Sequence, residues 1–329
     1  MSDTLLARSA EALFWLARYV ERTENLARIL DVNDTFSRDR AGGQNWLSIV
    51  QLHADEEAFF ARHTMASAQT VLGFYVTDAT NPTSVASAVR AARENARILR
   101  PLISTEMWVQ LNMFHARIAA LGPQDLRPGQ LSPLFAWIKE ACQLHTGITE
   151  GTFQRDQGWY FYQLGRYLER ADQTTRLLDI KYHVLLPDPR ELGSPVDVSQ
   201  WNALLRSAAG YHAYRRLHAT GITPAQVAGF LLLNRRFPRS VYLCVREAEL
   251  LLAELKARYG LRRGNAAAER LDGLRALLSG IGIEAILLQG LHEFLDMVQQ
   301  RLNLLGEDLM AGFFSYGDQR SFESPVSAR

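Results

Sequence analysis

The chain has 329 residues, of which 47% are hydrophobic and 22% are charged, a composition typical of a globular protein with a sizeable core. Its 36 basic and 35 acidic residues give a net charge of +1, which excludes nucleic acid or an anionic membrane as a partner held by a bulk positive field. The two cysteines, Cys142 and Cys244, lie in apolar helical surroundings without CxxC spacing. We therefore expect buried free thiols rather than disulfides or a zinc site.

Nothing along the chain indicates export or insertion into a membrane. The N-terminal segment carries Arg8, Glu11, Arg18 and Glu21 at helical spacing, and it lacks the apolar region and cleavage site of a signal peptide. No run of 18 uncharged apolar residues occurs, so no membrane span is predicted. We therefore expect a cytoplasmic protein.

The spacing of apolar residues predicts an all-α fold. No stretch alternates between apolar and polar residues for long enough to indicate a strand. Serine, threonine or proline at helix starts, and glycine or proline after helix ends, mark the boundaries. In chain order the expected helices are 4–36, a short one from 45, 54–63, 65–77, 84–100, 104–121, 133–153, 156–186, one from 223, 238–259, 266–279 and 284–314. Residues 315–329 contain nothing that could form a core, and we expect a flexible tail there.

One helical segment occurs twice in the chain. Residues 16–31 read LARYVERTENLARILD, residues 164–179 read LGRYLERADQTTRLLD, and eight of the sixteen positions are identical. Further matches lie 155 or 156 residues apart: Trp46 with Trp201, Gly73-Phe74 with Gly229-Phe230, Pro82 with Pro238, Ser84-Val85 with Ser240-Val241, and Val89-Arg90 with Val245-Arg246. This order predicts two copies of a multi-helix unit packed about an approximate twofold axis, followed by C-terminal helices.

The junction between the two copies is expected in the loop 122–132, which is rich in glycine and proline. We place the first helical repeat at residues 1–125. The second repeat and the C-terminal helices packed into the same body occupy residues 126–314.

The repeated helix has an apolar side and an opposite side with charged and amide side chains. A surface that only faces water would change in sequence between two copies, whereas several arginines and glutamates recur unchanged. Something specific therefore meets this side. The candidate residues are Arg18, Glu21, Arg22, Asn25 and Arg28 in the first copy, and Arg166, Glu169, Arg170, Asp172 and Arg176 in the second.

Two interpretations of these charged residues are open. In the first, the two copies cross and their arginines pair with Glu21 and Glu169, because an isolated buried charge is costly. In the second, they line a cleft where arginines hold a carboxylate or phosphate and the glutamates hold an amine. The two interpretations are compatible if pairing uses only part of each charged side.

A second candidate site lies at the turn 78–84 and its copy 234–240. The copy places Arg235, Arg236, Arg239 and Ser240 beside the start of a helix, which suits a phosphate or an acidic peptide. The alternative is a capped turn on a solvated corner.

No familiar catalytic or cofactor motif is present. The eight histidines are scattered, without HExxH or the ExxH of di-iron helical bundles, so no metal site is predicted. The chain also lacks GxSxG, a Walker A loop and GxGxxG, and no cofactor is predicted.

Four segments resemble the alpha-E domain family of bacteria over about residues 5–314. They are LFWLARYVERTENLARILD, GWYFYQLGRYLERADQTTRLLD, ARENARILR at 92–100 and FPRSV at 237–241. One departure is Gln173, where the first copy has Asn25. The resemblance implies an all-helical protein without an established activity. It also implies genes beside a circularly permuted ATP-grasp protein and a transglutaminase-like protease, a setting proposed to make and trim peptide or amide bonds. On this analogy the repeated glutamates and arginines are the functional candidates, although family membership does not itself show chemistry.

Three functions follow as hypotheses. The leading one is a helical accessory or scaffold partner of an ATP-grasp amide-forming system, with a charged cleft between the repeats for a peptide or amino-acid-like ligand. The second is an enzyme acting on peptide or amide substrates, with Glu21 and Glu169 as acid and base. The third is a purely structural homo-oligomer, whose sign would be a large apolar surface on the C-terminal helices and no polar cleft.

Overall fold

The structure, a computed structural model, describes residues 5–39, 46–184, 195–219 and 221–314. These residues form helices joined by turns, with no strand among them, which confirms the all-α prediction. The predicted tail at 315–329 lies outside the described residues. Within the described part of the chain, no helix has the length and apolarity needed to cross a membrane.

Most of the predicted helices are present, and several short helices join them. In chain order they are α1 Ala7–Asp39, α2 Leu47–Leu52, α3 Glu56–Phe60, α4 Ala68–Leu72, the π-helical turn η1 Gly73–Thr77, α5 Val85–Ile98, α6 Thr105–Ala119, α7 Leu131–Thr152, α8 Gln157–Val184, α9 Pro195–Ser207, α10 Tyr211–Leu217, α11 Pro224–Leu233, α12 Val241–Tyr259, α13 Asn265–Gly280, α14 Ile283–Gln289, α15 Leu291–Leu309 and the π-helical turn η3 Met310–Phe314.

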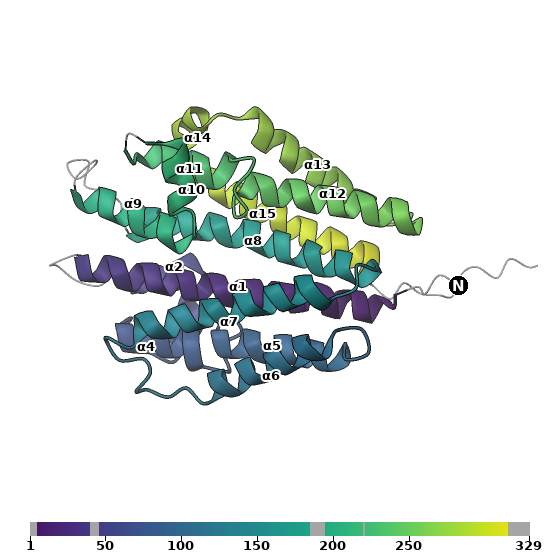
Figure 1. The fold of residues 1–329 in the computed structure, drawn as a ribbon. Helices are drawn as coiled ribbons and strands as arrows, with labels where there is room; N and C mark the ends of the chain where they lie inside the picture. The colour runs from purple at the N-terminus through teal and green to yellow at the C-terminus, as the bar shows by residue number, and fades with distance from the viewer. Residues whose placement is uncertain (1–4, 40–45, 185–194, 220, 315–329) are drawn as a thin grey trace, which may run out of the picture.

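Helices α1, α5, α6 and α7 form one four-helix bundle, the lower one in Figure 1. Helix α1 packs against α5 and α7, and α6 packs against the same two helices. Serine caps start α5 and α6, because Ser84 accepts a hydrogen bond from the N–H of Ser87 and Ser104 accepts one from that of Met107. The apolar sides of these helices turn inward to form the core of the bundle.

Helices α8, α12, α13 and α15 form a second four-helix bundle above the first. Helix α8 packs against α12 and α15, and α13 packs against the same two helices. Helix α12 begins at the serine cap Ser240 and ends at Gly260, whose φ of +62° is the left-handed conformation that glycine adopts at helix ends.

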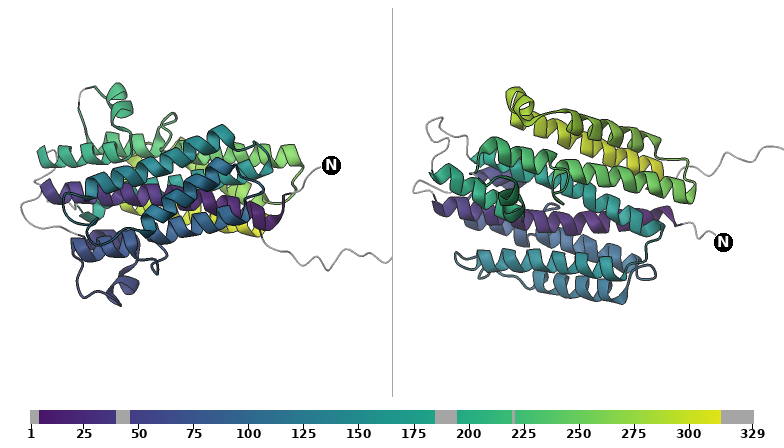
Figure 2. Two further views of the ribbon diagram at one scale, coloured as in Figure 1. Left: turned by 60° about the horizontal axis from the view of Figure 1, so that its bottom comes forward. Right: turned by 45° about the horizontal axis from the view of Figure 1, so that its top comes forward.

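The two bundles meet where α1 and α8 run side by side through the middle of the molecule (Figures 1 and 2). Gly165 permits this close approach, since a β-carbon at that position would collide with the backbone carbonyl of Phe14. A single apolar core continues through both bundles. The helix pair that carries the repeated charged residues is therefore the centre of the fold.

Two helices, α2 and α9, each pack on the central helix of the other half of the chain. Helix α2, from the first half, packs on α8, and α9, from the second half, packs on α1. Helix α7, which the predicted boundary after residue 125 assigns to the second repeat, packs on α1 and α6. The duplication of the whole unit, its twofold axis and the two repeat boundaries remain predictions.

The predicted helices at 284–314 and 65–77 need correction. The first is broken at Gly290, whose φ of +103° lies outside the range of a right-handed helix, so α14 and α15 are separate. The second begins at Ala68, after the cap Ser67, and its last turn is π-helical. Both cysteines are buried free thiols, as predicted.

Candidate functional site

The repeated charged residues meet at the contact between α1 and α8. Glu169 of α8 accepts hydrogen bonds from Nε of Arg22 at 2.6 Å, from Nη2 of the same side chain at 3.0 Å, and from Nε of Arg18 at 2.7 Å. The fork of Arg22 therefore holds both oxygens of the carboxylate, which is the strong geometry for this kind of pair.

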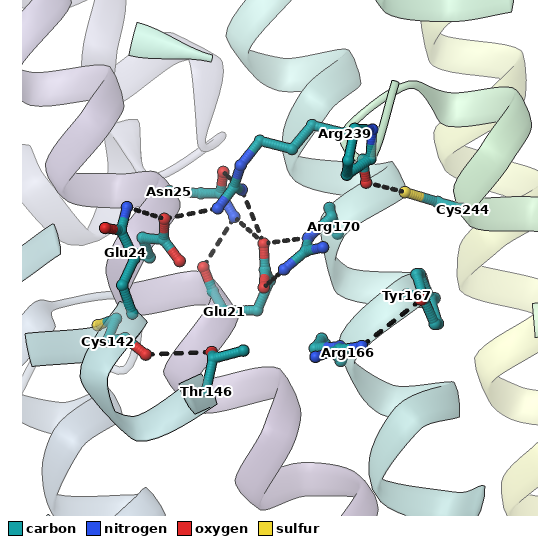
Figure 3. Close-up of polar contacts among 12 residues, drawn as sticks. Glu21, Glu24, Asn25, Cys142, Thr146, Arg166, Tyr167, Arg170, Arg239 and Cys244 are labelled. Carbon is teal, nitrogen blue, oxygen red and sulfur yellow. Dashed lines mark hydrogen bonds and ion pairs between the residues drawn. The ribbon is translucent and has the colours of Figure 1, made fainter. Parts of the chain in front are cut away.

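Glu21 of α1 makes the reciprocal contact with α8. It accepts hydrogen bonds from Nε and Nη2 of Arg170, both at 2.8 Å, and from Nη1 of Arg239 at 2.9 Å (Figure 3). Arg239 lies in the turn before α12 and was predicted as part of a surface anion site. It extends instead into the interior and also donates to Glu24 at 2.5 Å.

Both central glutamates are ionised at neutral pH. Burial alone raises the pKa of Glu169, but the opposing charges of Arg22 and Arg18 are stronger and bring it to about 2. Burial likewise raises the pKa of Glu21, and Arg170 and Arg239 outweigh it, so the net shift is downward. Glu21 is 3% exposed and Glu169 is 0% exposed. An ionised carboxylate lacks the proton of a general acid, and burial keeps both from the direct contact with a substrate that a general base needs.

An arginine and a carboxylate one turn apart extend each cluster along its helix. On α1, Arg28 pairs with Glu24 at 2.5 Å and donates to the backbone carbonyl of Ser207 at the end of α9. On α8, Arg176 pairs with Asp172 at 2.9 Å and donates to the carbonyl of Leu52 at the end of α2, at 3.2 Å. Arg28 and Arg176, which hold matching positions in the repeated segment, therefore bind the C-terminal ends of α9 and α2.

The remaining predicted residues of the two helices have different surroundings. Asn25 donates to the side chain of Glu21 at 3.1 Å and to its backbone carbonyl at 2.8 Å. Arg166 turns away from the centre and pairs with Glu150 of α7 at 2.9 Å. The structure therefore brings Arg18, Arg22 and Arg170 to the central glutamates, whereas Arg166 is outside their contact.

A small polar cavity opens beside Glu169. Its volume is about 190 Å³. It is lined by Arg18, Arg22, Leu26, His53, Thr83, Asp172, Gln173, Arg176 and Asn303. Four predicted site residues are thus on its wall, and His53, Thr83 and Gln173 join them. The Glu21 side of the contact is filled instead by the side chain of Arg239.

Three residues on the cavity wall have buried polar atoms without a hydrogen-bond partner among the described residues. These atoms are Nε2 of His53, Oδ1 of Asp172 and Oε1 of Gln173. Burial, assisted by the charges of Arg176 and Arg22, lowers the pKa of His53 to about 3, so its ring is neutral. Because buried polar atoms in proteins are nearly always paired, these three side chains hold hydrogen-bonding capacity beside the cavity that no described residue uses.

The Glu-Arg pairs at the centre of the fold agree with a known family description. Alpha-E, described as a predicted alpha-helical domain with a conserved ER motif, matches residues 5–314. The chain belongs to the Alpha-E family. Glu21-Arg22 and Glu169-Arg170 are ER pairs, and in this Alpha-E protein each glutamate is held by the arginine of the other pair.

Similar sequences are found within longer proteins. An uncharacterized protein of Mycobacterium bovis is 25% identical over 279 residues, and one of Mycobacterium tuberculosis is 24% identical over the same length. Each match covers 79% of this chain and 30% of the relative, so the chain spans less than a third of the length of these relatives. No solved structure matches the chain.

The predicted secondary anion site of this Alpha-E protein is divided between two places. Arg235 and Arg236 line a surface hollow of about 570 Å³, together with Arg216. Arg239 lies in the central cluster, and Ser240 caps α12 by accepting from the N–H of Leu243 at 3.2 Å. The four residues therefore do not form one site, because the turn directs the side chain of Arg239 inward.

One histidine bridges two carboxylates near the end of α8. Nδ1 of His292 lies 2.9 Å from Asp179, and Nε2 lies 3.5 Å from Asp296. Burial lowers the pKa of His292, but the two carboxylates outweigh that effect and raise it overall. The three groups lie within 4.8 Å of one another. Since both ring nitrogens face carboxylates, the arrangement favours the protonated imidazolium.

Proposed function

We propose that this Alpha-E protein is a helical partner of an ATP-grasp enzyme that forms amide or peptide bonds, and that its cavity beside Glu169 holds a peptide or amino-acid-like ligand. The polar cavity next to the crossed ER pairs carries the ligand part of this proposal. The ATP-grasp part is supported by the gene setting that the family resemblance implies.

The arginines on the cavity wall supply the chemistry for a carboxylate. Arg18, Arg22 and Arg176 hold Glu169 or Asp172 through their Nε atoms, and their side chains remain 14%, 25% and 21% exposed. A guanidinium has five N–H donors, so these side chains have donors left for a second anion. A carboxylate of a small ligand suits them better than a phosphate ester of nucleotide size, because the cavity volume is only about 190 Å³.

The length of the relatives supports a role alongside another protein. In the two mycobacterial relatives, the matching part covers 30% of a longer polypeptide. A unit that is joined to further sequence in its relatives is suited to act together with another polypeptide segment. The enzyme hypothesis has less support, because Glu21 and Glu169 are ionised, buried and saturated with arginine contacts.

The ligand is tested by a thermal-shift screen of the purified chain with the twenty amino acids and a set of dipeptides. We expect at least one compound to raise the melting temperature of the wild type, because a ligand that binds the folded state stabilises it. Arg176→Gln should remove the shift. Arg28→Gln, the matched change away from the cavity, should keep it even if it lowers the starting melting temperature. No shift with any compound would contradict the ligand part of the proposal.

The partner is tested separately by co-purification with the ATP-grasp protein encoded by a neighbouring gene. We expect a complex that survives size-exclusion chromatography. If the two proteins elute independently at micromolar concentration, with and without ATP, the partner part of the proposal is wrong.

A further inference from the structure

The turns that precede α5 and α12 have the same construction. In the first, the hydroxyl of Ser84 donates to the carbonyl of Asp78 at 2.6 Å. In the second, the hydroxyl of Ser240 donates to the carbonyl of Asn234 at 2.5 Å. Each serine also caps the helix that follows. The residue immediately before the serine is Thr83 in the first turn and Arg239 in the second. The size of this side chain decides whether the space beside the nearby central glutamate is filled.

In the second turn that residue is Arg239, and its guanidinium occupies a polar site on α1. Nη1 donates to Oε1 of Glu21 at 2.9 Å and to Oδ1 of Asn25 at 3.4 Å, and Nη2 donates to Oε1 of Glu24 at 2.5 Å (Figure 3). The chain therefore contains an example of a cationic group bound by two carboxylates and an amide oxygen.

In the first turn the corresponding residue is Thr83, which is too short to reach the matching place on α8. Its hydroxyl makes local contacts instead and shares its one proton between Oδ2 of Asp55 at 2.7 Å and Oδ1 of Asn81 at 2.6 Å. The matching residues on α8, each 148 positions further along the chain than Glu21, Glu24 and Asn25, are Glu169, Asp172 and Gln173. Thr83 lines the cavity with the last two of them. The space that a guanidinium fills on one side is therefore open on the other.

The hydrogen-bond acceptors beside that open space, Asp172 and Gln173, correspond to the groups that bind Arg239 on α1. Asp172 is 6% exposed and Gln173 is 4% exposed, and Oδ1 of the former and Oε1 of the latter have no hydrogen-bond partner in the described part of the chain. Their counterparts on α1 are the atoms of Glu24 and Asn25 that receive the Arg239 guanidinium, although Glu24 is one methylene longer than Asp172 and Asn25 is one methylene shorter than Gln173. A donor group that enters the cavity would meet the same kinds of acceptor.

A simple cation does not suit the cavity as a whole. Arg18, Arg22 and Arg176 bring three positive charges to it, against two negative charges from Glu169 and Asp172. A positive ligand would therefore face a net charge of its own sign, and a carboxylate alone would leave the unpaired oxygens without donors. A ligand with both groups satisfies both sides of the cavity.

We infer that the cavity binds a free α-amino acid as the zwitterion. Its ammonium donates to Oδ1 of Asp172 and Oε1 of Gln173 on α8, in the position that corresponds to the Arg239 guanidinium, and its carboxylate accepts from the remaining N–H groups of Arg18 and Arg22 on α1. Both oxygens are covered in the free protein, so binding requires the two side chains to rotate toward the ligand. The volume of about 190 Å³ lies below the ~300–1000 Å³ of pockets for drug-sized ligands, which selects a small amino acid. This inference rests on the proposed function and specifies its ligand.

Isothermal titration calorimetry with three matched probes tests the assignment. L-alanine carries both charged groups, L-alaninamide lacks the carboxylate, and propionate lacks the ammonium. We expect L-alanine to bind at least tenfold more tightly than either of the others. Equal affinity for propionate or for L-alaninamide would show that one half of the assigned site is not used. If no probe binds while a dipeptide does, the inference fails and the proposed function stands.

Thr83→Arg tests the position of the ammonium. The new guanidinium should occupy the acceptors of Asp172 and Gln173, so L-alanine should bind more than tenfold more weakly while the melting temperature is kept or raised. Arg235→Thr, a change in the matching turn that touches neither the cavity nor the central cluster, should leave the affinity for L-alanine within twofold of the wild type. Undiminished binding to Thr83→Arg would overturn the inference. If that variant does not fold, Gln173→Leu replaces it, with an expected loss of at least fivefold.

Discussion

Glu169 lies at 0% exposure and receives three hydrogen bonds from Arg18 and Arg22. A buried ion pair of this kind adds little stability over a well-packed apolar pair, because desolvation offsets the attraction. Removing one partner strongly lowers the free energy of unfolding, since it leaves the other charge buried and unpaired. The value of the pair therefore lies in fixing which residue of α1 faces which residue of α8.

The change Glu169→Gln separates a buried pair from a surface pair. We expect it to lower the free energy of unfolding by about 3–5 kcal/mol, because the guanidinium groups of Arg18 and Arg22 lose their counter-charge. Urea unfolding followed by circular dichroism gives this value. Glu94→Gln is the control, since its side chain is 44% exposed beside an Arg97 that is 60% exposed, and it should cost less than about 1 kcal/mol. Equal losses for the two variants would contradict the buried-pair interpretation.

Part of this residue pattern could be predicted from the sequence. Arginines and glutamates recur unchanged on the polar side of a repeated helix, which made pairing between the two copies one of two open interpretations. The structure contains such pairs, Arg22 with Glu169 and Arg170 with Glu21, but the sequence did not specify which arginine meets which glutamate. The role of Arg239 could not be predicted from the sequence, because this residue belongs to a run of arginines that resembles a solvated turn. His53 also gave no signal, since a single histidine at the end of a short helix carries no spacing information.

At the scale of helices, the contact between α1 and α8 depends on Gly165. The glycine lies against the backbone of Phe14, and the α1 segment beside it carries Arg18 and Glu21. Ala17 holds the matching place in the first copy of the repeated segment, so the sequence offered a glycine at only one of the two positions. A pattern comparison cannot show this close approach, because the distance between helices is a property of their packing.

The change Gly165→Ala tests that contact. We expect it to lower the free energy of unfolding by about 1–3 kcal/mol, as overpacking in a core does, because the new methyl group meets the carbonyl of Phe14. Gly147→Ala in α7 is the control, since a β-carbon there meets nothing within 4 Å, and alanine should stabilise the helix by about 0.5–1 kcal/mol. Differential scanning calorimetry measures both, and a neutral or stabilising Gly165→Ala would disprove the close contact.

Helix boundaries were the less predictable part of the fold. The heptad-like spacing of apolar residues continues through Gly290, so periodicity alone predicts one helix where the structure has α14 and α15. The break depends on the positive φ of Gly290, and a glycine within an apolar pattern is compatible with either outcome. Serine caps such as Ser84 and Ser104, in contrast, are local features and were readable from the sequence.

On the scale of the whole molecule, the crossed glutamates connect the two bundles. Glu21 is bound by arginines of the second bundle, and Glu169 by arginines of the first. The short helices α2 and α9 make further connections in the same crossed manner. Because one apolar core also continues through both bundles, we regard the described helices as one folding unit.

Acid should weaken this connection. The pKa of Glu169 is about 2 in the folded protein, against about 4.3 for an unfolded glutamate, so the unfolded state binds the proton first. The stabilisation is complete above about pH 5 and is lost as the pH falls from about 4.5 toward 2. Thermal unfolding between pH 7 and pH 3 should show a melting temperature that decreases below pH 5, with a smaller decrease for Glu169→Gln. The same pH dependence in both proteins would assign the effect to other carboxylates.

The crossed connections also set an order of events during synthesis. Residues of α1 leave the ribosome long before Arg170 and Arg239 are translated, so Glu21 must stay in water until most of the polypeptide has been made. The nascent first bundle cannot bury that carboxylate by itself without a large penalty. Completion of the central helix pair is therefore a late step, which waits until α8 and the turn before α12 have been made.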